Sequence, residues 1–170
     1  MARDGGLRHA SGMSSVTVGR VIAAPIDRVW AVFTDISAAA DRIAGINSVE
    51  VLSEPAFGPG FRWRETRTVF GRSASEEMWV TDLEAPRFYE VAAASHGTEY
   101  LSRYTFAPVE GGTRVSLTFS GTPVSATAKV MGRLTGWIAD GQVGKMLQKD
   151  LDDLVAVCER AVGEGDPGDR

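Results

Sequence analysis

Carboxyl, guanidinium and phenol side chains share one face of the strands predicted between residues 61 and 119. Glu65 and Arg67 alternate with Trp63 along one strand, and Tyr100 and Tyr104 alternate along another. A carboxyl group in apolar surroundings can donate a proton or a hydrogen bond, and a phenol can do the same. These residue types therefore suit acid–base catalysis or the anchoring of a ligand carbonyl or phenol, and Glu65, Tyr100 and Tyr104 are the catalytic candidates.

Three glycine-containing turns define which residues share this face. We place two-residue loops at Gly71-Arg72, His96-Gly97 and Gly111-Gly112, each joining two antiparallel strands. The expected opposed pairs are Trp63 with Val80, Glu65 with Met78, Arg67 with Glu76 and Val69 with Ala74; then Tyr89 with Tyr104, Val91 with Ser102, Ala93 with Tyr100 and Glu90 with Arg103; then Phe106 with Leu117 and Tyr104 with Phe119.

The shared face is half apolar and half polar, which is unusual for a dry core. Buried charges without partners cost several kcal/mol each, whereas a half-apolar pocket with a few polar groups is typical of a small-molecule site. We therefore expect a cavity of at least a few hundred Å3 that binds a small apolar or aromatic molecule. The predicted ligand-binding residues are Trp63, Glu65, Arg67, Glu76, Met78, Val91, Tyr100, Ser102, Tyr104 and Phe119.

Glu65 has no charged residue opposite it in this pairing scheme. Desolvation would then raise its pKa above the usual value of about 4.3, so that it could anchor a ligand together with Tyr100. The alternative is a carboxylate held by Arg67, two residues away on the same face. Arg67 and Glu76 could equally form a structural ion pair at the cavity rim.

A long amphipathic segment, Thr122–Ala161, is expected to cover this face as a helix. Pro123 suits the first helical position and Thr122 can cap it. Its apolar residues keep helical spacing, but four glycines interrupt the middle. We expect a bend or break between Gly136 and Gly144.

The chain before residue 61 predicts a strand, two short helices and a second strand. Residues 16–22 are rich in β-branched side chains, and a helix is expected to begin at Pro25. Asp35 or Ser37 can cap the second short helix, which Gly45 would end. A second strand is expected within residues 46–54.

Length and composition predict one domain. The chain has 170 residues, 44% of them hydrophobic, and a formal net charge of -4 with scattered basic residues. We expect a single domain at residues 15–162 between mobile tails at 1–14 and 163–170. No basic stripe indicates nucleic acid, and no signal peptide or membrane span is recognisable, so we expect a cytoplasmic protein without integral membrane contact. The oligomeric state is left open.

The residues that commonly hold metals or act as nucleophiles are sparse. Cys158, the single cysteine, falls on the apolar helix face, and the two histidines are His9 in the N-terminal tail and His96 in a turn. We therefore expect no metal site and no catalytic triad. The sequence also lacks a glycine-rich phosphate loop, and no cofactor is expected.

The order of elements resembles a known superfamily. Residues 24–30 (APIDRVW) follow the first strand, residues 111–115 (GGTRV) lie in the strand region, and an amphipathic helix ends the chain. In this it is similar to the START-like (SRPBCC) superfamily, particularly its polyketide cyclase/dehydrase and lipid-transport group. The resemblance implies an α+β helix-grip fold, in which a curved antiparallel sheet wraps around a long C-terminal helix with a cavity between them.

Three functions remain open at this point. The first is a carrier or sensor that binds a small, largely apolar ligand and needs only the cavity. The second is a polyketide cyclase or dehydratase, which needs an acid–base group from Glu65, Tyr100 or Tyr104. The third is a co-chaperone or interaction module, which would need an exposed apolar patch.

Overall fold

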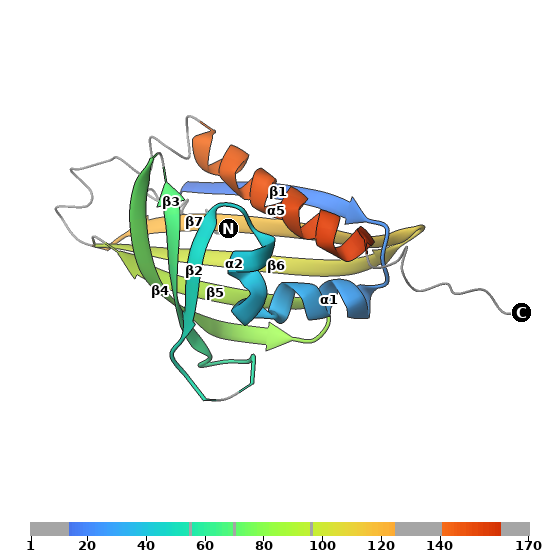
Figure 1. The fold of residues 1–170 in the computed structure, drawn as a ribbon, viewed down its shortest axis with the longest axis horizontal. Helices are drawn as coiled ribbons and strands as arrows, with labels where there is room; N and C mark the ends of the chain where they lie inside the picture. Colours follow the sequence, from blue (N-terminus) through green and yellow to red (C-terminus); the bar gives the residue numbers. More distant parts are fainter. Residues whose placement is uncertain (1–13, 55, 70, 96, 125–140, 161–170) are drawn as a thin grey trace, which may run out of the picture.

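A computed structural model describes residues 14–54, 56–69, 71–95, 97–124 and 141–160. Their strands form one seven-stranded antiparallel sheet in the order β1-β7-β6-β5-β4-β3-β2 (Figure 1). The strands are β1 (Ser14–Ile22), β2 (Ile46–Val51), β3 (Arg62–Val69), β4 (Arg72–Glu84), β5 (Phe88–Ser95), β6 (Thr98–Val109) and β7 (Gly112–Pro123). The sheet is curved and does not close, because β1 and β2 remain its two edges.

The helices lie against one face of this sheet, called the inner face below (Figure 1). They are α1 (Ile26–Thr34), the 3-10 turn η1 (Ile36–Ala38), α2 (Ala39–Arg42) and α5 (Gln142–Arg160). The helix α5 packs mainly on β1 and also touches α1 and α2. This arrangement confirms the predicted helix-grip fold, with two short helices after the first strand.

The first helix forms where the sequence predicts it. Pro25 occupies the cap position, and Val29 and Phe33 are buried one turn apart. Asp35 or Ser37 was expected to cap the second short helix, but neither η1 nor α2 has a side-chain capping bond. The two carboxylate oxygens of Asp35 instead accept from Ser37 at 2.8 Å and from Arg42 at 2.7 Å, so Asp35 joins the two short elements to each other.

Only the middle hairpin has the predicted register. Tyr89, Val91 and Ala93 face Tyr104, Ser102 and Tyr100, as expected. The first and third hairpins are each shifted by two residues, because Val69 pairs with Arg72 and Val109 pairs with Gly112.

The conformation of glycine explains both the correct register and the two errors. Gly71, Gly97 and Gly111 have φ values of 75°, 75° and 81°, and each is the second of the two residues between the paired strand ends. Glycine adopts this left-handed region without strain. The prediction placed Gly97 second in the middle turn, but it placed Gly71 and Gly111 first in the other two turns. Since side chains alternate with period two, a shift by two residues leaves every residue on its predicted face.

The predicted start of the C-terminal helix is wrong. Pro123 belongs to β7 and pairs with Thr98, because the long β6–β7 hairpin continues its pairing to the start of β6. The described helix begins at Gln142, directly after Gly141, whose φ of 70° is incompatible with an α-helix. Gly141 lies inside the interval where a break was predicted, and residues 125–140 lie outside the described part of the chain.

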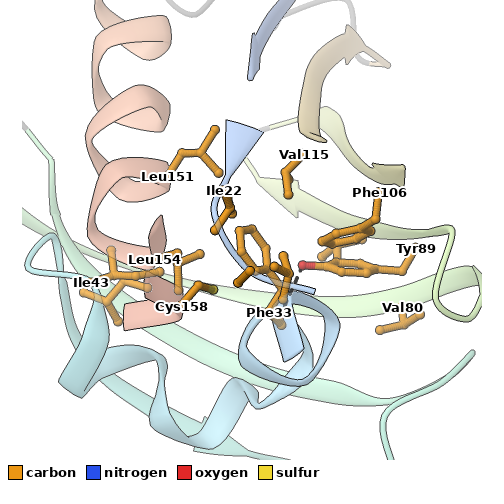
Figure 2. Packing of buried hydrophobic residues seen from close by; sticks show 14 of the residues in the cluster. Ile22, Phe33, Ile43, Val80, Tyr89, Phe106, Val115, Leu151, Leu154 and Cys158 are labelled. Carbon is orange, nitrogen blue, oxygen red and sulfur yellow. Dashed lines mark hydrogen bonds between the residues drawn. The ribbon is translucent and has the colours of Figure 1, made fainter. Parts of the chain in front are cut away.

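The core fills the space between α1, α5 and the inner face of the sheet (Figure 2). Ile22, Val29, Val115 and Cys158 are completely buried. Cys158 was expected to be a core residue, and its burial raises the pKa of the thiol to about 11. Burial of apolar side chains, of which these are the most completely enclosed, is the dominant favourable contribution to folding.

The predicted tails lie outside the described residues, apart from Ser14, which pairs with Gly121 at the start of β1. The single domain at residues 15–162 stays a prediction. Within the described ranges, no helix combines the length and apolar character needed to span a membrane.

Candidate functional site

An ion cluster of three side chains links β3 to α5. Arg67 Nε lies 2.9 Å from Glu65 Oε1, and Arg67 Nη2 donates to Asp150 Oδ2 at 2.8 Å. The side chains of Arg67, Glu65 and Asp150 are 16%, 11% and 14% exposed. The cluster therefore holds two carboxylates and one guanidinium in a largely dry part of the molecule.

Strand and helix periodicity position these three groups. Glu65 and Arg67 are two residues apart on β3 and so project from the same face. Asp150 lies beside Leu147 and Leu151, whose buried side chains fix the rotation of α5. The helix α5 thus supplies the second carboxylate, Asp150, to the guanidinium of Arg67 on β3, a strand that is far away in sequence.

Burial dominates the electrostatics of Glu65. Desolvation raises the pKa of its carboxyl group, and although the positive charge of Arg67 opposes this, the pKa remains above its ordinary value. The nearby charge of Asp150 raises it further. Burial also lowers the pKa of Arg67, but Asp150 and Glu65 together outweigh burial and raise it, so the guanidinium stays charged.

Aromatic side chains border the cluster. Tyr104 stacks on Tyr89 with ring centroids 4.6 Å apart. Burial raises the pKa of the Tyr104 phenol, and the charges of Asp150 and Glu65 add to this, which places the phenol within electrostatic range of both carboxylates. Trp63 is 3% exposed, and its indole N–H has no well-aligned acceptor among the described residues.

A second group of predicted residues lies along β6 and β7. Tyr100 stacks on Phe119 with centroids 5.7 Å apart, and burial raises the pKa of its phenol. Ser102 is half-buried and pairs with Phe119 across the two strands. Tyr100 was expected beside Glu65, but Tyr104 is the tyrosine whose pKa responds to that carboxylate.

The remaining predicted residues divide between the core and the sheet. Val91 is buried, and Met78 packs on the core. Glu76 faces Glu65 rather than Arg67, so the predicted ion pair of Arg67 with Glu76 is wrong. The cause is the two-residue shift of the β3–β4 hairpin. The expectation that Glu65 faces Met78 without a charged partner is wrong for the same reason.

Asp150 is the site residue that the sequence analysis missed. It stands between buried apolar positions of α5, which is a signal for an acid turned partly inward. That signal alone does not name its partner, because the partner belongs to a strand more than 80 residues earlier.

A groove of about 450 Å3 lies elsewhere on the surface, at the ends of β5 and β6 beside the start of α1. Its two guanidiniums are already paired, Arg87 with Glu84 and Arg103 with Glu90. Arg103 also covers the ring of Phe88. Both arginines of the groove are neutralised, and Phe88, Arg103, Thr105 and Ala107 line it from the outer face of the sheet. We therefore place the candidate site at the inner cluster and call this groove the outer groove.

Across the described ranges, no three histidine, cysteine or acidic residues are arranged to hold a metal ion.

Comparison with known proteins agrees with this architecture. Residues 13–159 match the family model described as polyketide cyclase / dehydrase and lipid transport. The chain belongs to this family. The match confirms the START-like resemblance and spans every described element of the fold except Arg160, the last residue of α5.

Solved structures share the fold at low identity. The Zhui aromatase/cyclase from a Streptomyces species is 21% identical, with a TM-score of 0.73 over 88% of this chain and 96% of that one. A Thermus thermophilus protein is 19% identical, with a TM-score of 0.70 over 89% of this chain and 99% of that one. The di-domain ARO/CYC protein StfQ, from the steffimycin biosynthetic pathway, is 10% identical, with a TM-score of 0.73. The match covers 89% of this chain and 52% of StfQ. No curated protein matches the sequence.

Proposed function

We propose that this family member binds a small, largely apolar molecule between the inner face of the sheet and α5, as a carrier or sensor. The observation that carries the proposal is the Glu65–Arg67–Asp150 cluster, which sets a polar anchor against aromatic walls. Ligand sites of proteins typically combine apolar walls with a few polar groups in this way. The predicted ligand-binding residues and the predicted cavity are part of this proposal.

The indole N–H of Trp63 supports a polar ligand group at this place. A hydrogen bond from this indole lowers the pKa of Glu65 against the larger effect of burial, so the indole lies beside that carboxyl group. A ligand carbonyl or hydroxyl oxygen there would accept from Trp63.

Family membership supports the ligand class. The family description joins polyketide cyclases with lipid transport, and one similar structure is named as an aromatase/cyclase. Both descriptions concern apolar or polycyclic molecules. We therefore propose a ring-containing or lipid-like ligand.

A neutral fluorescent probe, N-phenyl-1-naphthylamine, tests the proposal by titration. Phe119→Ala removes a half-buried ring that stacks on Tyr100, and we expect the probe to bind roughly ten-fold more weakly. Phe88→Ala is the matched control, because it removes a half-buried ring that lines the outer groove. Unchanged affinity in Phe119→Ala with loss in Phe88→Ala would place binding in the groove and refute the proposal.

The raised pKa of Glu65 favours one alternative, a cyclase or dehydratase. In dehydration of a cyclised poly-β-ketone, a base takes a proton from carbon while an acid protonates the departing hydroxyl, which leaves as water. Glu65 would be the acid, and Tyr104 would hydrogen-bond the substrate oxygen. Release of water from a β-hydroxyketone model substrate, lost in Glu65→Gln, would support the enzyme over the carrier.

A further inference from the structure

Two arginines of the inner face, Arg20 and Arg67, form ion pairs with acidic residues of α5. Arg20 of β1 pairs with Asp152 at 2.7 Å, at the partly exposed edge of the sheet. Arg67 of β3 pairs with both Glu65 and Asp150. Neither guanidinium is therefore available to a negatively charged ligand.

We infer from this pairing that Glu65 selects ligands by charge: the site accepts neutral molecules that carry a hydroxyl or phenol donor and rejects carboxylates of the same shape. The inference rests on the proposed binding function and names its ligand class. Asp150 alone would balance the charge of Arg67. Glu65 supplies the excess negative charge.

The geometry leaves Glu65 able to accept from a ligand. A carboxylate offers about four lone-pair sites, and the Arg67 contact involves one of its oxygens. A phenol O–H can donate to the remaining positions, and its oxygen can accept from the indole N–H of Trp63. A ligand carboxylate brings a second negative charge and no donor, in surroundings where charges are weakly screened.

Two ligands with the same ring system and different polar groups, 2-naphthol and 2-naphthoate, test the inference when titrated near pH 7 against the full-length protein. We expect the wild-type protein to bind 2-naphthol at least ten-fold more tightly. In Glu65→Gln the cluster loses its excess charge, so binding of 2-naphthoate should strengthen and the preference should fall several-fold. Glu77→Gln is the control, because it removes the same charge from the outer face of the neighbouring strand β4, where Glu77 pairs with Arg62, and the preference should persist.

The outcomes separate the inference from the proposed function. Binding of both ligands with a preference that Glu65→Gln leaves unchanged would overturn the inference and keep the binding function. Binding of neither ligand to the wild-type protein would overturn both. If Glu65→Gln does not fold, the wild-type ratio decides, and equal or tighter binding of 2-naphthoate overturns the inference.

Discussion

At the residue scale, Glu65 combines two interpretations that the sequence analysis set against each other. Its pKa is raised, as predicted for a desolvated acid, yet Arg67 contacts it, as predicted for an ion pair. Both interpretations are correct, because Arg67 also pairs with Asp150. The charge of Arg67 lowers the pKa of Glu65 by less than burial and the charge of Asp150 raise it.

The raised pKa of Glu65 predicts a definite dependence of stability on pH. An acid with a raised folded-state pKa stabilises the fold below its ordinary pKa of 4.5, and this contribution is lost as pH rises through the folded-state pKa. Glu65→Gln cannot titrate. The stability of the wild-type protein relative to Glu65→Gln should therefore fall as pH rises from about 4 to 7.

Urea denaturation of both proteins across this pH range measures the difference. A difference that stays constant, or that grows in favour of the wild-type protein, would show that the pKa of Glu65 is not raised in the folded state.

At the element scale, the Arg67–Asp150 hydrogen bond ties α5 to β3, the strand next to the edge strand β2. We expect Asp150→Asn to destabilise the fold by about 1–3 kcal/mol, because it weakens a charged hydrogen bond at a largely buried place. Asp152→Asn is a matched control on the same helix, since the Arg20–Asp152 pair is 39% and 50% exposed, and exposed pairs contribute about 0–1 kcal/mol.

Urea denaturation compares the two helix variants, and amide exchange in α5 locates the effect. Equal loss of stability in both would mean that the inner ion pair contributes no more than the exposed one.

The sequence predicts the secondary-structure elements and the inner face of the sheet better than it predicts which side chains contact each other. The alternation of side chains placed Glu65, Arg67 and Tyr104 on the inner face, and a two-residue error in the register of a hairpin leaves them on that face. The partner of Arg67 depended on register and on the rotation of α5, which are set by tertiary packing. Local pattern therefore located the candidate site but could not supply Asp150.

At the scale of the whole molecule, the two faces of the sheet differ in how their charges are used. The outer groove pairs Arg103 with Glu90 at its surface, whereas the inner cluster holds an excess carboxylate among buried rings. The charges of the surface groove are thus neutralised, and the proposed function requires that the ligand binds at the interior cluster instead.

Intermolecular nuclear Overhauser effects between 2-naphthol and the protein test most directly where the ligand binds. Binding at the interior cluster predicts contacts from the naphthol ring to Trp63, Tyr104 and Phe119. Contacts confined to Phe88 and Arg103, with none to the inner aromatic rings, would place the ligand in the outer groove and contradict it.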